Sequence, residues 1–460
     1  MSRTVTLERV GLPRFEVPDA RPVVPAEEYE RRLMTLRERV DADVVVAYGD
    51  REHFANLAFF CGFDPRFEEA LLVLGREKPT LVVGREGLAY TRLVPPDVHV
   101  VLCPSLGLMG QERAGAGTLA QALAGAGVGA GNTVGIVGWK YLEPDEWDAE
   151  PAPIAAPAFV VDTIRHLAGR AGAVLDATRA VMNPVDGLRA VSSADQIAAF
   201  EWAAARASRA VARVLAAARP GATEQETVSA MGYAGEPLSA HVMFSSGPEI
   251  AVGLRSATTR RLEQGDAATV AIGFWGGLCC RAGLVEPAEP RPGTHAAAYL
   301  ERLAIPYWRA IAAWYETVRL GVTGGEVDAA IRDVLAAEEF GSALNPGHLT
   351  HLDEWVHSPI RPGSSETLRS GMAFQCDIIP DNAGPGWAAN CEDALVLADE
   401  ALRAEIARRH PDVWARMQER QRFMRERLGI PLAEEILPLS SLPAYFPPFW
   451  LDLDFALVAS

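Results

Sequence analysis

Three short segments of the chain decide how it folds. They are Asn345–Pro359 (NPGHLTHLDEWVHSP), Gly371–Asp377 (GMAFQCD) and Asn390–Val396 (NCEDALV). The first holds three of the nine histidines within ten residues, together with two carboxylates. A lone histidine is usually a structural residue, but three at this density favour a functional site. The two later segments complete the pattern, because each brings a further carboxylate from a strand-like run.

In this order the three segments resemble the catalytic half of the methionine aminopeptidase, prolidase and creatinase family, which has the pita-bread fold. The resemblance continues upstream through LRAVSSADQIAAF (188–200) and LEQGDAATVAIGFWGG (262–277). ANLAFFCGFDPRFEEALLVL (55–74) is similar to the N-terminal domain of aminopeptidase P, prolidase and creatinase. The resemblance therefore implies an α/β N-terminal creatinase-like domain followed by an α+β pita-bread C-terminal catalytic-type domain.

Local patterns place the domain boundaries. Residues 1–180 alternate strand-like and helix-like runs, as in an α/β domain. Ser193 and Gln196 have the spacing of a capping box, which predicts the start of a long helix in a second domain, 181–400. Residues 401–460 form a helical extension with a Pro-rich and aromatic end, YFPPFWLDLDF. This end packs over a hydrophobic surface or a partner subunit, or else it covers the mouth of a site.

The family resemblance implies a set of metal ligands that this chain keeps only in part. Family metalloenzymes hold two metal ions with two Asp, one His and two Glu. His348 matches the histidine and Glu392 the last glutamate, whereas Asp377 stands where the other glutamate belongs. The two aspartate positions fall on Ala271 and on Arg281 or Ala282. We expect no two-metal centre, because closely spaced dications need bridging carboxylates.

A single metal ion on His348, Asp377 and Glu392 stays open, because three protein ligands and a water suffice for a catalytic site. Mn, Fe, Co and Zn are the candidates, and no cofactor at all is the leading expectation. The upstream histidine that shuttles protons in many family members is also replaced, since Val252–Arg255 occupies its region.

Creatinase, the metal-free member of the family, implies another way to use such a site. His348, His351 or His357 would act as the general base, with Glu392 or Asp377 as its orienting or acid partner. The same segment holds Glu354, which is either an extra acid–base or substrate-contacting group or part of a helix start.

Two arginines are candidates for substrate binding, because they stand near lost metal-ligand positions. Arg255 and Arg281 would favour a substrate that carries a carboxylate, which guanidinium binds with two parallel hydrogen bonds. The alternative for Arg281 is an internal ion pair with Glu286 or Glu392.

The composition excludes several classes of partner. The 460 residues carry 43 Lys and Arg against 60 Asp and Glu, a formal net charge of −17, so no basic face for nucleic acid is expected. The first residues, MSRTVTLERVGLPRF, lack an apolar signal-peptide core, which predicts a cytoplasmic protein without a membrane partner. A small-molecule substrate is expected, and the resemblance implies a homodimer.

The predicted function is metal-independent hydrolysis of a C–N bond in a small amino-acid-like substrate, by a divergent creatinase-like or aminopeptidase-P-like enzyme. Three alternatives stay open: an Xaa-Pro peptidase with a single metal, a lyase of the dimethylsulfoniopropionate-cleaving type, and a non-catalytic ligand-binding homologue.

Overall fold

The computed structural model describes residues 4–113, 117–381, 383–384 and 386–460. It divides into two compact units. The small unit is Val24–Ala190, and the large unit combines Met1–Val23 with Val191–Ser460. The division falls ten residues beyond the boundary predicted at 180, and residues 401–460 join the large unit instead of standing apart. Pairing of Val5–Arg9 with Phe455–Ala459 ties both ends of the chain to the large unit.

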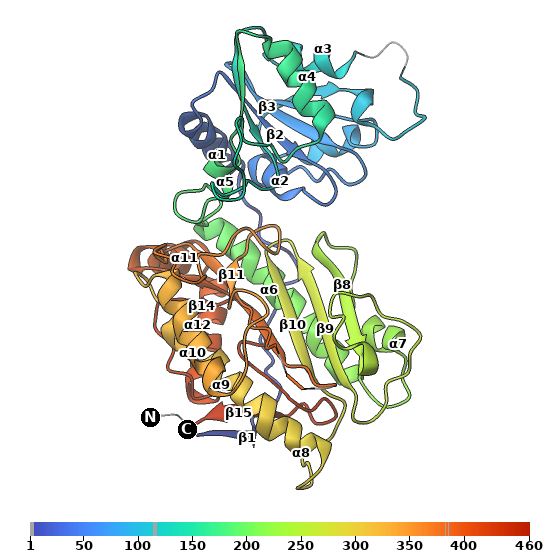
Figure 1. The fold of residues 1–460 in the computed structure, drawn as a ribbon, viewed down its shortest axis with the longest axis vertical. Helices are drawn as coiled ribbons and strands as arrows, with labels where there is room; N and C mark the ends of the chain where they lie inside the picture. The colour runs from blue at the N-terminus through green and yellow to red at the C-terminus, as the bar shows by residue number, and fades with distance from the viewer. Residues whose placement is uncertain (1–3, 114–116, 382, 385) are drawn as a thin grey trace. The chain divides into compact units, whose positions relative to one another are not determined.

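The small unit is built on a mixed six-stranded sheet (Figure 1). Its order is β5 (His99–Leu102), β4 (Thr80–Val83), β3 (Ala70–Leu74), β2 (Val44–Gly49), β6 (Thr133–Val137) and β7 (Ala173–Asp176). β2 is buried along its whole length, as an apolar run in the middle of a covered sheet should be. Its helices are α1 (Ala26–Arg39), α2 (Ala55–Cys61), η1 (Leu88–Leu93), η2 (Pro104–Leu106), α3 (Leu119–Gly125), α4 (Ala158–Ala168) and α5 (Arg179–Met182).

The large unit has an antiparallel sheet as its framework. The order is β11 (His348–Leu349), β12 (Ala373–Cys376), β13 (Asn390–Leu397), β10 (Gly277–Leu284), β9 (Ala267–Phe274) and β8 (Leu238–Ser246), and β14 (Ile436–Pro438) also pairs with β13. The helices are α6 (Ala194–Ala217), α7 (Glu224–Ser229), η3 (Gly247–Glu249), α8 (His295–Tyr299), η4 (Leu300–Ala304), α9 (Ile305–Thr317), α10 (Gly324–Ala337), α11 (Glu400–Arg409) and α12 (Pro411–Glu426). This is the α+β arrangement that the sequence predicts.

Helix α6 covers one face of the sheet, against β9 and β10 (Figure 1). Ser193 caps it as predicted, because its hydroxyl accepts a hydrogen bond from the amide of Gln196. The contact with the sheet is close: a Cβ on Gly277 would lie 2.7 Å from the backbone of Ala204. Glycine and alanine at this crossing therefore set the distance between the two layers.

The helical segment from His295 to Thr317 is interrupted by a π-turn. The segment runs as α8, the π-helical η4 and then α9. Pro306 lies in the first turn of α9 and has no N–H to donate, which removes one regular helical hydrogen bond at this point.

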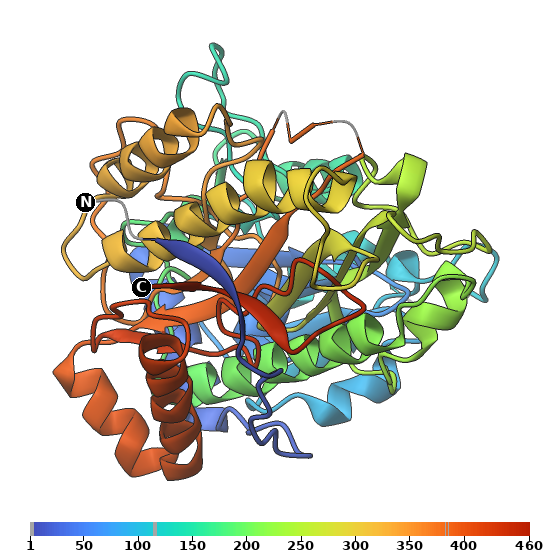
Figure 2. The ribbon, with the colours of Figure 1, turned by 90° about the horizontal axis from the view of Figure 1, so that it is seen from below.

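The two ends of the chain complete the large unit. Strand β1 (Val5–Arg9) pairs antiparallel with β15 (Phe455–Ala459), and the two lie side by side in Figure 2. The aromatic end packs inward as predicted for a hydrophobic surface, since Tyr445, Phe446 and Trp450 are buried. None of the helices in the described parts of the chain is long and apolar enough to cross a membrane.

Candidate active site

Strand β13 separates two sets of polar side chains. Successive residues of a strand point to opposite faces, so Asn390 and Glu392 share one face while Cys391 and Asp393 share the other. Glu392 lies opposite Cys280 on β10, and Cys280 lies opposite Ala271 on β9. This register brings together positions from three strands.

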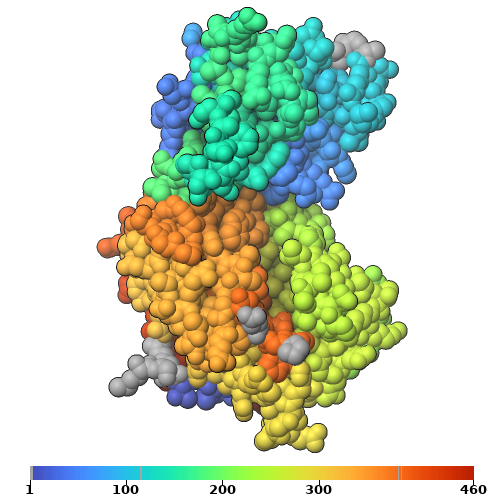
Figure 3. Space-filling model, viewed as in Figure 1, coloured from blue at the N-terminus to red at the C-terminus, as the bar shows by residue number. Residues whose placement is uncertain are grey.

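A cavity of about 940 Å³ opens on the face that carries Asn390 and Glu392. It forms a hollow between the yellow-green segment that includes β8 and the orange segment that follows α10 (Figure 3). Glu354, Asp377 and Glu392 are its acidic lining residues. Much of the remaining wall is apolar, with Met243, Ile250, Leu254, Leu278, Leu344, Trp355, Ile379, Pro380 and Trp387.

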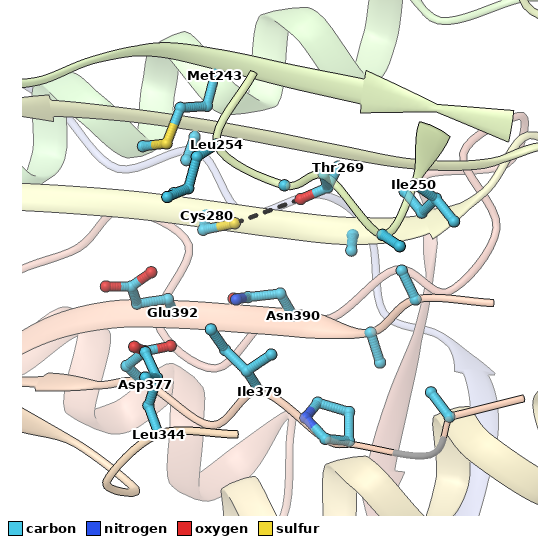
Figure 4. A pocket seen from close by; sticks show the side chains of 18 of the residues that line it. Met243, Ile250, Leu254, Thr269, Cys280, Leu344, Asp377, Ile379, Asn390 and Glu392 are labelled. Carbon is cyan, nitrogen blue, oxygen red and sulfur yellow. Dashed lines mark hydrogen bonds between the residues drawn. The ribbon is translucent and has the colours of Figure 1, made fainter. Parts of the chain in front are cut away.

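The acidic side chains gather around His348 at one wall. His348 Nε2 lies 3.1 Å from Glu354 Oε1 and 4.0 Å from Glu392 Oε1. The imidazole stacks on the Trp355 ring, with centroids 4.0 Å apart and the planes inclined by 22°. Asp377 and Glu392 point toward the same space in Figure 4. One histidine and three carboxyl groups therefore form a cluster, His348, Glu354, Asp377 and Glu392, which we call the acidic cluster.

Burial and mutual charge shift the pKa values within the acidic cluster. Burial, and then the negative charges of Asp377 and Glu354, raise the pKa of Glu392 well above its ordinary value. Burial also raises the pKa of Asp377 to about 6, although His348 opposes the shift. For His348, burial alone would lower the pKa, but the neighbouring Glu354 outweighs it and the pKa is raised. The cluster thus favours a protonated Glu392 and a protonated His348.

The other histidines of the first segment lie elsewhere. His351 is buried and packs edge-on against Phe200, with ring centroids 4.8 Å apart. The backbone of His357 pairs with Leu349, whose amide donates to the His357 carbonyl at 2.8 Å. Neither residue is among the described residues that line the cavity. His348 is not a lining residue either, but its contacts with Glu354 and Glu392 place it directly beside the cavity wall.

Neither predicted substrate-binding arginine lines the cavity within the described residues. Arg255 makes an ion pair with Glu224, at 2.7 Å. Arg281 is fully buried on the opposite face of the sheet, where its Nη2 lies 2.6 Å from Asp393 Oδ2. The internal ion pair foreseen as the alternative for Arg281 is present, but its partner is Asp393 and not Glu286 or Glu392.

The Arg281–Asp393 pair binds the C-terminal segment 440–445 through hydrogen bonds. Arg281 donates to the carbonyl groups of Tyr445 and Leu442, and Asp393 accepts from Ser440 Oγ at 2.6 Å and from the Ala444 amide at 2.9 Å. Both charges therefore have hydrogen-bond partners, as buried ions require.

The sequence and the fold both resemble those of known proteins. Residues 198–399 match the sequence profile of metallopeptidase family M24. The predicted family resemblance is confirmed. A curated relative, "Probable dipeptidase PepE" of Mycobacterium tuberculosis, is 32% identical over 223 residues, which is 46% of this chain. The chain spans 57% of the length of that relative.

Solved structures of dipeptidases and prolidases resemble most of the chain. Dipeptidase PepE from Mycobacterium ulcerans has 25% identity and a TM-score of 0.56, covering 82% of this chain and 94% of its own. Prolidase from Thermococcus sibiricus has a TM-score of 0.63 over 82% of this chain and 96% of its own, with 16% identity. The second likeness shows the fold alone: a creatinase-like N-terminal domain and a pita-bread C-terminal domain.

The site does not fit the two-metal centre usual in family M24. Ala271 and Ala282 line the cavity at the positions where the family resemblance places its aspartates. Methyl groups cannot bridge two dications, so the shared ligands of such a centre are missing.

One divalent cation does fit the acidic cluster. Ligand atoms of His348, Glu354 and Glu392 lie within 4.8 Å of one another. His348 Nε2, Glu354 Oε1 and Asp377 Oδ1 are buried and lack a regular hydrogen bond among the described residues. Two of the three predicted ligands, His348 and Glu392, are in this set, and its third member is Glu354 instead of Asp377.

Sequence reasoning missed Trp355 and Asn390. Trp355 stacks on the histidine and Asn390 lines the cavity. The signal for Asn390 was available, because it stands two residues before Glu392 and so shares its face of the strand. The position of Trp355 depends on how the loop between β11 and β12 folds, which no periodic pattern describes.

Proposed function

We propose that the protein hydrolyses a C–N bond in a small amino-acid-like or amidine-like molecule by acid–base catalysis in the acidic cluster. The observation that carries the proposal is the pair Asp377 and Glu392, two buried carboxyl groups with raised pKa values at one wall of a ligand-sized cavity. Such a pair can supply a proton acceptor and a proton donor at the same pH.

The two carboxyl groups have different roles in the proposed reaction: Asp377 accepts a proton and Glu392 donates one. The pKa of Asp377, about 6, favours its carboxylate form at neutral pH, whereas burial and the neighbouring acids raise the pKa of Glu392 well above its ordinary value and favour its protonated form. Asp377 takes a proton from a water molecule while the water oxygen bonds to the substrate carbon. Glu392 gives its proton to the nitrogen as the C–N bond breaks. Transfer of one proton from Asp377 to Glu392 then restores both groups.

His348 has a different role here from the general base predicted from sequence. Its raised pKa and its ion pair with Glu354 favour the imidazolium form, which cannot accept a further proton. A fixed positive charge beside the cavity stabilises negative charge that develops on a substrate oxygen. Stacking on Trp355 holds the ring in place.

A second candidate, a peptidase with one divalent metal ion, is favoured by the close ligand atoms of His348, Glu354 and Glu392. A cation held there would lower the pKa of a bound water and polarise a substrate carbonyl. The prolidases among the similar structures make Xaa-Pro dipeptides the natural substrates to test.

The first experiment measures Mn, Fe, Co and Zn per chain in protein purified without chelator, alongside His348→Ala. We expect far less than one equivalent, and C–N cleavage of an amide and amidine panel that persists in EDTA. About one equivalent that is lost in the His348→Ala variant would instead support the single-metal peptidase.

Water labelled with ¹⁸O separates hydrolysis from the lyase alternative, because only hydrolysis adds a water oxygen to the product. A non-catalytic homologue would be stabilised against heat by a ligand that it leaves unchanged. The homodimer and the cytoplasmic location stay predictions, and sedimentation of the purified protein checks the first.

A further inference from the structure

The cavity lining carries acidic side chains, and the positive group beside it, His348, is already ion-paired with Glu354. Among the described residues that line it there are three acids, Glu354, Asp377 and Glu392, and no lysine or arginine. Arg255 and Arg281 are already neutralised by Glu224 and Asp393. A substrate carboxylate would therefore find no lysine or arginine partner among the described lining residues.

Two hydrogen-bond acceptor atoms lie buried at the cavity. Asn390 Oδ1 and Asp377 Oδ1 are buried and have no hydrogen-bond partner within the described residues. Asn390 and Glu392 extend from the same strand into the cavity, with Asp377 beside them (Figure 4). Buried acceptors are costly when unpaired, so a ligand that fits this place donates hydrogen bonds.

The wall on the other side of the cavity is apolar. Met243 and Leu254 lie across from Glu392 in Figure 4, while Leu344 and Ile379 lie below it. Trp387 adds an aromatic surface. The site therefore offers acceptors at one wall and hydrocarbon contacts at the others, as an amphiphilic ligand needs.

We propose that the substrate is an amine with an apolar side group and no free carboxylate. Its ammonium group donates hydrogen bonds to Asn390 Oδ1 and to Asp377 Oδ1, and its apolar group lies against Met243 and Leu254. Asn390 is thus a specificity-determining residue. The inference rests on the proposed function only in taking this cavity as the place of reaction. It replaces the carboxylate-bearing substrate expected from sequence.

The test compares two probes that differ in charge and share one ring, cyclohexylmethylamine and cyclohexanecarboxylate. Calorimetric titration into chelator-treated protein should show binding of the amine and none, or far weaker binding, of the carboxylate. Equal binding of both, or preference for the carboxylate, would overturn the proposal.

Two substitutions of similar size then locate the contact. Asn390→Leu removes the acceptor and should weaken amine binding about tenfold or more, the usual loss for a hydrogen bond to a charged group. Asn390→Asp keeps an acceptor and should bind the amine at least as tightly as the unaltered protein. The thermal midpoint of each variant without ligand shows that it has folded. Equal amine affinity in both variants would remove Asn390 from the proposal.

Failure of the amine-binding proposal can be distinguished from failure of the proposed hydrolysis. If the amine binds as expected and no amide or amidine of an apolar amine is cleaved, the inference holds and the proposed hydrolysis fails. If dipeptides with a free carboxylate are cleaved and the amine does not bind, hydrolysis holds and the inference fails.

Discussion

Glu392 and Asp393 are neighbours on one strand, yet their side chains have opposite kinds of surroundings. Asp393 faces the interior, where Arg281, Ser440 and the Ala444 amide satisfy it. Glu392 faces the cavity, where its neighbours Asp377 and Glu354 are themselves acidic. This difference between the neighbours of the two residues indicates that burial alone does not make a carboxyl group reactive. A buried carboxyl group that is paired stabilises the fold, and one among like charges holds a proton for chemistry.

Removing the proton donor should have the largest effect. Glu392→Gln keeps the size of the side chain but cannot give up a proton, so the rate of C–N cleavage should fall about a thousandfold. Steady-state kinetics on the best substrate of the panel measures it. The urea midpoint should change little, because the amide needs no counterion. A variant that keeps most of its activity would assign the donor role elsewhere.

The same change one residue later should act on stability instead. Asp393→Asn leaves Arg281 buried without a full counter-charge, which costs about 3–5 kcal/mol of unfolding free energy. Urea denaturation followed by tryptophan fluorescence measures it. Replacing both partners, Arg281→Met with Asp393→Leu, should recover much of the loss. If Arg281→Met raised KM without lowering stability, Arg281 would be a substrate ligand after all.

Asp377→Asn should stabilise the protein, opposite in sign to Asp393→Asn. The folded pKa of Asp377 is raised from 3.8 to about 6, so its contribution to stability is present at low pH and is lost as pH rises through 6. Above pH 6 the asparagine variant should be more stable by about 3 kcal/mol, and near pH 4 the difference should almost vanish. Urea titrations in EDTA at both pH values test this. A loss of stability in the variant at high pH that appears only without EDTA would point to a bound cation.

The smallest effect is expected at Ser440. Ser440→Ala removes one of the neutral hydrogen bonds to Asp393, while Arg281 and the Ala444 amide remain. The unfolding free energy should fall by about 1 kcal/mol, with no change in kcat or KM. A larger loss would mean that the pairing of Asp393 depends on the complete set of donors.

The sequence predicted the fold better than the roles within the site. Capping at Ser193, the apolar runs of the small unit and the order of the three motif segments are local signals, and each corresponds to an element of the structure. His348, Asp377 and Glu392 were named from motifs; Asp377 and Glu392 line the cavity, and His348 lies 4.0 Å from Glu392.

Pairings between distant residues could not be predicted in the same way. Alternation along β13 shows that Glu392 and Asp393 face opposite ways, but not that Arg281 lies on the side of Asp393. That depends on the register in which Cys280 pairs with Glu392. Glu354 likewise reaches His348 through a loop, whose path carries no periodic signal.

The pairing of β1 with β15 has a consequence for synthesis of the chain. Residues 24–190 hold the whole small unit in one continuous stretch, so it can fold while translation continues. The large unit can close only after residues 455–459 leave the ribosome and join Val5–Arg9. Until then Arg281 lacks the carbonyl groups of Leu442 and Tyr445, and a nascent chain stalled before them carries an unfinished sheet for chaperones to recognise.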